Sequence, residues 1–301
     1  MTKDEARRLV DRFGGGAKLG KLEEKKYIEA LKLLIAEDND PAMMIELGGY
    51  YYDRKEYDKA LNYYEDAAKL GYDPAYECLG YVWYYGRAGR RDYERAYRCF
   101  AYLYKKGNMV AAYKVADMYK NGYYVEKDEA KYREIIEKLY DELKDRSVIE
   151  DDRINIYLPV PEVFLRLGRI KQADGDTEAA LDLYYDAAAW LAERIRYNPF
   201  FGNLNIMKWL ADDIYSIEEF DYEEFTFYDL YYLLKTPNKI AFKLFETEFT
   251  VESVPGDEEC RIIFDGKTFS DRNDFFANAM AGDKPLTFFY EMFTDFRIIK
   301  N

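Results

Sequence analysis

The chain has 301 residues, a formal net charge of −14, and 49% hydrophobic, 34% charged and 18% aromatic residues. Such a composition is typical of a folded protein, and the negative charge argues against nucleic acid and against an anionic membrane as partners. The chain contains no histidine. This excludes Ser-His-Asp and Cys-His nucleophiles and histidine-based zinc sites, and we expect no catalytic residues, no metal and no cofactor.

The negative charge is concentrated towards the end of the chain. Residues 200–301 hold 20 Asp and Glu against 10 Lys and Arg, a net of −10, so the other 199 residues contribute only −4. The three cysteines, Cys78, Cys99 and Cys260, are few and far apart, which suits a reducing compartment. No segment resembles a signal peptide or is apolar enough to span a membrane, so a cytoplasmic location is predicted.

Residues 1–39 are predicted to form N-terminal capping helices, over residues 3–13 and 21–36. The stretch between them, residues 15–22, spells G-x4-G-K, as in phosphate-binding loops. However, Leu22 takes the place of the required Ser or Thr, and a helix rather than a strand precedes the stretch. We therefore favour a helix stop and a flexible link over a nucleotide site.

Residues 40–199 repeat a pattern about every 36 residues, and Ala60, Ala96 and Tyr132 lie at that spacing. In the first three units a large residue, a small one and then an aromatic residue share one stripe of a helix. The small residue would let a second helix approach closely, and Gly71 and Gly107 would end such helices in the left-handed conformation. The small residues are Gly48, Gly80, Ala116 and Gly168. Because one hairpin cannot bury both of its apolar stripes, neighbouring hairpins are expected to stack.

Residues 40–145 resemble Sel1-like repeats, which are variable-length relatives of tetratricopeptide repeats, and residues 162–198 resemble a plain tetratricopeptide unit. The third unit carries the G-x2-V-x2-D-x2-K part of the Sel1-like pattern as Gly122, Val125, Asp128 and Lys131. The chain departs from the pattern at Arg54, in place of a Gly, and at Tyr132, in place of an Ala. The resemblance implies a solenoid of helical hairpins that acts as an adaptor, since such repeats share no active site.

The period is interrupted after the third unit. Residues 144–161 contain Asp151-Asp152 and two prolines, which indicate a loop. After the fourth unit, residues 200–235 are predicted to form an acidic helical connector, with one helix over 203–217 and a second over 223–235.

Residues 236–301 are predicted to form a small α+β domain, so the fold class is mostly α: a helical-hairpin repeat solenoid followed by this domain. Strand signals cover residues 249–254 and 260–264, and Asp265-Gly266 is typical of a two-residue hairpin turn. Residues 240–247 fit a helix or a strand, and we favour a strand. The remaining predicted elements are a helix that Asp271 caps, running to Met280 and ended by Gly282, a helix over residues 286–296, and a strand over 297–299.

Tyrosines are concentrated in the repeats, where residues 50–140 hold 21 of the 32. The Leu-Gly pairs align the first helices with those of tetratricopeptide repeats. In that alignment one set of side chains faces the inner groove of the solenoid. This predicted partner-binding groove comprises Tyr52, Glu77, Tyr81, Tyr84, Tyr113 and Asp117. Tyrosine is enriched in binding hot spots, but extra tyrosines also pack aromatic-rich interiors, and both interpretations stay open.

Residues 209–234 contain eight acidic residues and no Lys or Arg. They could form an acidic aromatic surface that captures a cationic peptide or mimics nucleic acid. We favour the simpler interpretation, two amphipathic helices with solvated acidic faces.

The sequence therefore predicts a non-catalytic scaffold that binds a protein or peptide segment, with basic character favoured, in the aromatic groove of the repeats. An alternative is a ligand-sensing or regulatory protein that acts through residues 236–301, and a carboxylate-dependent enzyme comes third. No nucleic acid and no membrane is expected as a partner, and the sequence leaves the oligomeric state open.

Overall fold

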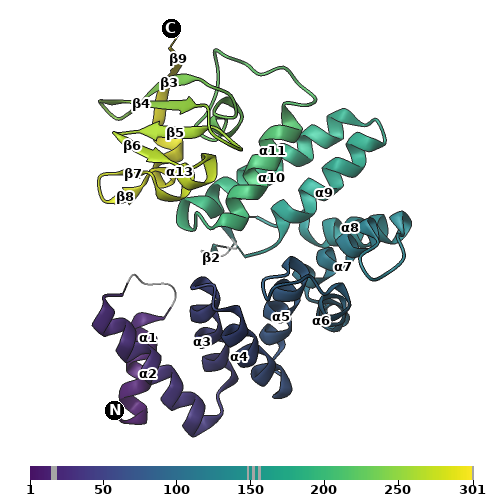
Figure 1. Ribbon diagram of the computed structural model, residues 1–301. Helices are drawn as coiled ribbons and strands as arrows, with labels where there is room; N and C mark the ends of the chain where they lie inside the picture. Colours follow the sequence, from purple (N-terminus) through teal and green to yellow (C-terminus); the bar gives the residue numbers. More distant parts are fainter. Residues whose placement is uncertain (15–18, 148, 151–152, 155–156, 300–301) are drawn as a thin grey trace. The chain divides into compact units, whose positions relative to one another are not determined.

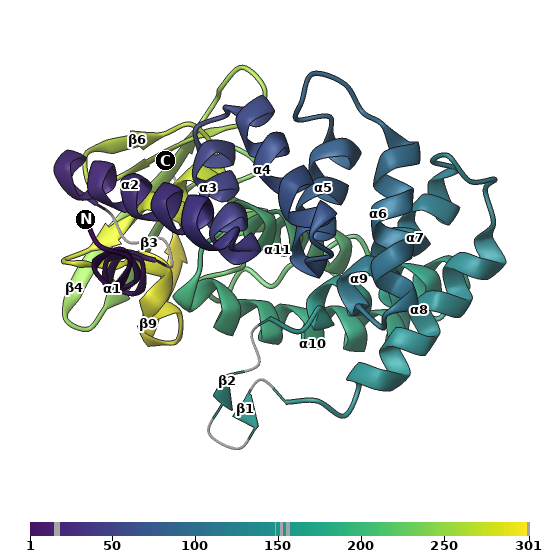
Figure 2. The ribbon, with the colours of Figure 1, turned by 90° about the horizontal axis from the view of Figure 1, so that it is seen from below.

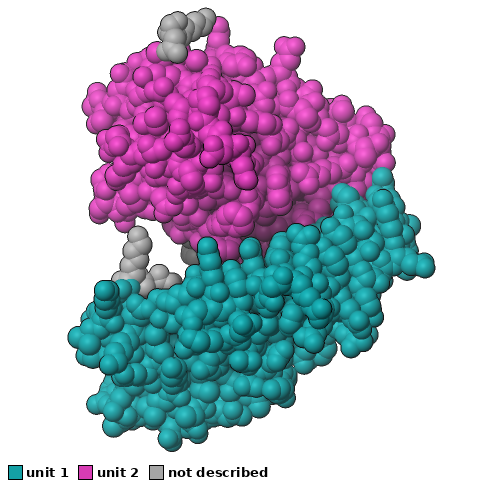
Figure 3. Space-filling model, viewed as in Figure 1, with its two compact units in different colours: residues 1–135 teal, residues 136–301 magenta. Residues whose placement is uncertain are grey.

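The computed structural model describes residues 1–14, 19–147, 149–150, 153–154 and 157–299. The Asp151-Asp152 pair and most of the G-x4-G-K stretch lie outside the described residues. The chain forms two compact units, residues 1–135 (unit 1) and residues 136–301 (unit 2), which Figure 3 draws in different colours. The domain boundaries that the sequence suggests, after residues 39, 199 and 235, stay predictions.

Unit 1 is built of helices joined by short turns, as the repeat pattern predicts. Figure 2 shows them following one another in chain order. They are α1 (Lys3–Phe13), α2 (Lys21–Asp38), α3 (Pro41–Asp53), α4 (Tyr57–Lys69), α5 (Asp73–Tyr85), α6 (Tyr93–Lys105), α7 (Met109–Asn121) and α8 (Glu129–Leu143), and the last of these continues into unit 2 (Figure 1). The pairs α3 and α4, α5 and α6, and α7 and α8 are the first and second helices of the three predicted repeats.

The helices begin and end where local side-chain and backbone chemistry dictates. The Asp40 side chain caps α3, accepting a hydrogen bond of 2.9 Å from the Ala42 N–H, and Pro41 takes the first helical position, where its missing N–H is not needed. Gly71 follows α4 with φ 75°, and Gly107 follows α6 with φ 83°. The predicted left-handed helix stops are therefore confirmed.

In the first two hairpins the small residue of the first helix lies against an aromatic ring of the second. A Cβ on Gly80 would lie only 2.6 Å from Cε1 of Phe100, and a Cβ on Gly48 would collide with the Tyr64 ring. Both rings are almost fully buried. Hydrogen in place of a side chain is thus what lets the two helices of a hairpin pack so closely.

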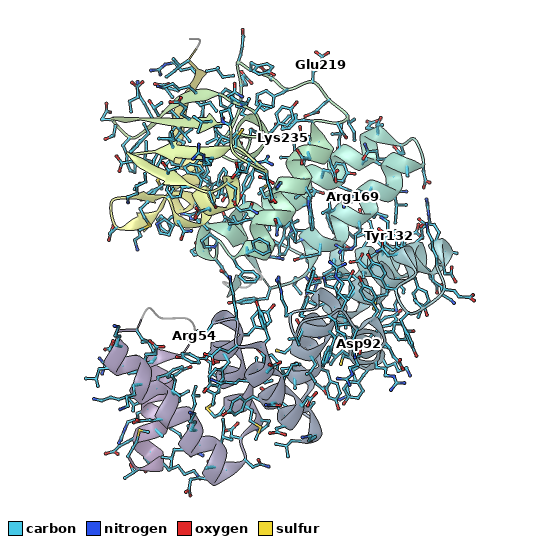
Figure 4. All side chains as sticks on the ribbon, in the orientation of Figure 1. Arg54, Asp92, Tyr132, Arg169, Glu219 and Lys235 are labelled. Atoms are coloured by element: carbon cyan, nitrogen blue, oxygen red, sulfur yellow. The ribbon has the colours of Figure 1, made fainter. Side chains whose placement is uncertain are left out.

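The two departures from the Sel1-like pattern have structural reasons. Arg54 ends α3, lies 3.6 Å above the centre of the Tyr50 ring and forms an ion pair with Glu24 on α2. It thereby links the first repeat to the helix before it. Tyr132 is completely buried on α8, and its hydroxyl is 3.5 Å from Nζ of Lys120 (Figure 4).

Unit 2 begins with a hairpin of α9 (Val160–Ala173) and α10 (Thr177–Tyr197), followed by α11 (Phe201–Ile214). Before α9 lie two short paired strands, β1 (Ile149–Glu150) and β2 (Arg153–Ile154). A Cβ on Gly168 would collide with the Tyr184 ring, as in the repeats of unit 1. The Arg194 guanidinium joins the helices, since it is 2.8 Å from Oε1 of Glu162 on α9 and 3.4 Å from Oδ1 of Asn203 on α11.

The helix predicted over residues 223–235 is wrong for most of its length. Only α12 (Leu230–Leu233) is helical, and residues 215–229 are irregular. Asp221 accepts hydrogen bonds from the N–H groups of Glu223 and Glu224, and Asp229 accepts one from the Thr226 N–H. Such local side-chain bonds compete with helix formation and favour turns.

The C-terminal part of unit 2 is an antiparallel sheet with the strand order β6-β5-β4-β3-β9. Its strands are β3 (Lys239–Leu244), β4 (Thr247–Val254), β5 (Arg261–Phe264), β6 (Lys267–Phe269) and β9 (Phe293–Ile298). Asp265 and Gly266 have φ of 48° and 69° and turn the chain between β5 and β6, as predicted. Residues 240–247 form β3 and the turn that follows it, so the strand interpretation is confirmed.

The end of the chain differs in detail from the prediction. Asp271 does cap a helix, α13 (Arg272–Asn278), but Gly282 turns a small hairpin of β7 (Met280–Ala281) and β8 (Lys284–Pro285) instead of ending that helix. The helix predicted over 286–296 is a 3-10 helix, η1 (Leu286–Met292), and β9 begins earlier than expected. Phe293, the first residue of β9, is buried and stacks on Phe227, a contact that the sequence pattern does not reveal.

Two adjacent glycines of α3 provide a test of the close helix contact. Gly48→Ala should lower the free energy of unfolding by about 1–3 kcal/mol, because the added methyl group overpacks the contact with Tyr64. Gly49→Ala meets nothing within 4 Å and should raise the free energy of unfolding by about 0.5–1 kcal/mol through helix propensity. Urea denaturation of both variants measures this, and equal effects would contradict the role assigned to Gly48.

Candidate partner-binding site

The residues of the predicted groove lie on the first helices of the three repeats in unit 1. Tyr113 is buried with 6% of its surface exposed. The others are half-buried. Tyr52 is on α3, Glu77, Tyr81 and Tyr84 are on α5, and Tyr113 and Asp117 are on α7.

Tyrosines of α5 and α7 surround a buried lysine, Lys114 of α7. Its ammonium nitrogen lies 5.1–5.3 Å from the centres of the rings of Tyr81, Tyr84, Tyr85 and Tyr113 and 3.1 Å from the Tyr85 hydroxyl. Only 6% of Lys114 is exposed. Ring faces attract a cation more strongly when water is excluded, so these tyrosines form an aromatic cage whose occupant is the chain's own ammonium group.

The tyrosine rings also pack against one another. The hydroxyls of Tyr81 and Tyr113 are 3.4 Å apart, which joins α5 to α7. Tyr84 meets Tyr123 edge to face at 6.0 Å, and Tyr123 is stacked on Tyr93 at 4.1 Å. Interior packing therefore explains part of the tyrosine surplus, and a role of these rings in partner binding stays a prediction.

Tyr52 and Asp117 lie at other points of the first helices. Tyr52 packs edge to face on Tyr57 with the ring centres 5.2 Å apart. Asp117 is close enough to Tyr123 for its charge to contribute to raising the pKa of that phenol, after burial and the Tyr93 hydroxyl. The structure thus groups three of the six predicted residues tightly and leaves Tyr52 in a separate ring pair.

Glu77 is a half-buried carboxylate on α5. Burial raises its pKa above the usual range, and the Asn108 side chain and the Lys114 charge oppose that shift only in part. A carboxylate that is held in a place that disfavours its charge costs stability, and perturbed groups of this kind cluster at functional sites. Glu77 is therefore a predicted groove residue with a distinct electrostatic signature.

Sequence reasoning missed Lys114, because lysine is expected on the surface and nothing in its neighbours along the chain predicts burial. A lysine immediately after Tyr113, on a helix predicted to face tyrosines of the preceding repeat, was the available signal.

The cysteines of unit 1 offer no activated nucleophile. Burial raises the pKa of Cys78 to about 12 and that of Cys99 to about 12. Among the residues that the structure describes, no group of three or more His, Cys, Asp or Glu side chains could hold a metal ion. In that part of the chain no helix is both long enough and apolar enough to cross a membrane.

Two carboxylates at different points of α5 test this electrostatic interpretation. Glu77 binds its proton more tightly in the folded than in the unfolded chain, so stability is lost as the pH rises above about 4.3, the unfolded pKa. Glu77→Gln removes that loss. We expect this variant to exceed the wild type in free energy of unfolding by up to about 1 kcal/mol at pH 7, and the difference to vanish near about pH 4.

Asp73 is the matched control, because its shift has the opposite sign. Lys106, with Nζ 2.6 Å from Oδ1 of Asp73, lowers the pKa of this carboxyl. Its ion pair therefore stabilises the fold at neutral pH, and that contribution is lost as the pH falls through the lowered pKa. Asp73→Asn should be less stable than the wild type at pH 7. Urea denaturation across pH measures both variants, and a Glu77→Gln variant that behaves like Asp73→Asn would refute the interpretation of Glu77.

Comparison with known proteins finds likeness in solved structures alone, since no family model and no curated protein matches the chain. One similar structure is c5321, a protective antigen of uropathogenic Escherichia coli strains that displays an SLR fold, with 18% identity and a TM-score of 0.46. The match covers 70% of this chain and 45% of that one, so it spans less than half of the antigen. A second is a Sel1 repeat protein from Oxalobacter formigenes, with 19% identity, a TM-score of 0.46, and 70% and 84% of the two chains covered. The helical hairpins and small-residue contacts described above are the architecture that the resemblance to Sel1-like repeats implies.

Proposed function

We propose that the chain is a non-catalytic scaffold that binds a segment of another protein on the first-helix surface of unit 1, around Glu77 and the neighbouring tyrosines. The observation that carries the proposal is the half-buried Glu77, whose pKa is raised by burial beside a tyrosine cluster. A purely structural position would gain stability from an uncharged side chain of similar size. A binding function would explain why a glutamate is present at this position despite its cost in stability.

The cage around Lys114 determines how such a partner would be recognised. Since the ammonium group of Lys114 already lies among the four rings, a cation of the partner would not enter the cage. It would pair with the carboxylates of Glu77 and Asp117, while the half-buried rings of Tyr81 and Tyr84 supply apolar contact. Basic character of the partner then provides selectivity and a faster association, and the tyrosines provide most of the affinity.

The test compares two neutralised pairs of acids in the full chain. Glu77→Gln with Asp117→Asn should reduce the capture of a partner from a lysate of the source cells at least about tenfold, because both proposed charge contacts are lost. The control is Asp66→Asn with Glu94→Gln, two exposed acids on the second helices α4 and α6, which should leave capture unchanged. Quantitative mass spectrometry of the captured proteins gives the readout, and far-ultraviolet circular dichroism verifies the fold.

Equal loss of the same partner in both pairs would indicate a response to net charge and would count against the groove. Undiminished capture by the Glu77 and Asp117 pair would also contradict the proposal.

A further inference from the structure

Unit 2 contains a pocket of about 830 Å³. It is lined by residues of α10, α11, the irregular residues 215–229, the end of η1 and the start of β9. Its volume is within the range of about 300–1,000 Å³ that is typical of ligand sites. Most of the lining precedes residue 236, so it differs from the pocket within residues 236–301 that the ligand-sensing alternative predicts.

The floor of the pocket is apolar and is formed by small and branched side chains. It comprises Ala188, Ala189 and Ala192 of α10 with Leu210 and Ile214 of α11. Ala189 is exposed, whereas Ala192, Leu210 and Ile214 are buried. Such a floor gains free energy when it contacts apolar side chains of a ligand.

The rim of the pocket is acidic. Its lining contains no Lys or Arg, and residues 218–229 contribute six carboxylates, which are Glu218, Glu219, Asp221, Glu223, Glu224 and Asp229. None of the six forms an ion pair with a Lys or Arg among the residues that the structure describes. Two further acids of the lining are paired: Asp295 is 2.6 Å from Lys243, and Glu291 is 3.7 Å from Arg196. The lining acids without such an ion pair therefore all belong to residues 218–229, the segment on which Figure 4 labels Glu219.

The acidic segment is fixed by contacts of its own. Its aromatic rings Phe220, Phe225 and Phe227 are buried, and Phe225 packs on Phe296 of β9 with the ring centres 5.2 Å apart. The Tyr215 hydroxyl donates a hydrogen bond of 2.7 Å to Asp229. The segment follows α11 in the chain and contributes to the lining of the pocket. A preorganised rim lowers the cost of binding.

We propose that this pocket binds a basic amphipathic segment of a partner protein, with apolar side chains on the alanine-lined floor and Lys or Arg side chains at the acidic rim. Charge complementarity selects the basic side chains, and the apolar floor selects a polypeptide over a small hydrophilic amine. The proposal does not depend on the tyrosine-lined surface of unit 1. It assigns a function to the acidic stretch for which solvated helices were the favoured interpretation.

The experiment measures fluorescence anisotropy of a fluorescein-labelled helical peptide made of Lys and Leu, with the Leu residues on one face. Two matched peptides have Ser in place of Leu, or Glu in place of Lys. The full chain should bind the Lys/Leu peptide at least about tenfold more tightly than either matched peptide, and added salt should weaken the binding.

Three variants of the chain locate the binding. Glu223→Lys with Glu224→Lys reverses exposed charges of the rim, and Ala189→Trp fills the floor without changing the charge; each should weaken binding at least about tenfold. The control is Asp257→Lys with Glu258→Lys, which makes the same change of charge at an exposed loop outside the pocket lining and should have no effect. Glu77→Gln with Asp117→Asn should also have no effect, which separates this proposal from that for unit 1.

Several outcomes would overturn the proposal. If the rim variant and the Asp257 and Glu258 control weakened peptide binding equally, the attraction would be due to net charge alone. The same conclusion would follow if the Lys/Ser peptide bound as tightly as the Lys/Leu peptide. An unaffected Ala189→Trp variant would exclude the floor. Binding of spermine with no binding of the Lys/Leu peptide would identify a small-amine site. Self-association of the chain that the rim variant abolishes, seen by analytical ultracentrifugation, would identify a second copy as the occupant.

Discussion

The contact on which three of the four predicted repeats depend is the one between a glycine of a first helix and an aromatic ring of the second. At Gly48, Gly80 and Gly168 a Cβ would collide with the facing ring, so a larger residue fits only if the ring or its helix shifts. Packing at this density leaves little freedom in the distance and angle between the helices. A hairpin held in this way exposes two apolar stripes, and stacking of further hairpins follows from the need to cover them.

This constraint is local, and for that reason it could be predicted. The small residue, the aromatic residue and the glycine stop recur within about 36 residues, and the Asp265-Gly266 turn is likewise encoded in two adjacent residues. Residues 215–229 could not be predicted in the same way. Their alternating acids and aromatics suit an amphipathic helix as well as a chain of side-chain-capped turns. The choice depends on tertiary contacts such as that of Phe225 with Phe296, which lie 71 residues apart in the chain.

The candidate site in unit 1 was predictable only in part, for a related reason. A tyrosine on a repeat helix satisfies both a groove and an interior, because its ring is apolar and its hydroxyl is polar. The contact that distinguishes a groove tyrosine from an interior tyrosine is the one with Lys114, which for the α5 tyrosines belongs to the neighbouring repeat. Once that ammonium group lies among the rings, the cage is full, and the half-buried Glu77 becomes the feature that packing does not explain.

Both units contain ion pairs, and residues 218–229 stand apart because their acids form none among the residues that the structure describes. In unit 1 acids such as Asp38, Asp73 and Asp128 are paired with Lys or Arg, so their fields are neutralised within a few ångströms. In residues 218–224 of unit 2 the acids repel one another, and the buried rings and the turns of Asp221 must hold them together against that repulsion. A basic segment that reaches this rim would relieve the repulsion and cover the apolar floor at once. Neither the charge nor the floor alone would give both gains, which is why their coincidence in one pocket favours an amphipathic occupant over a simple cation.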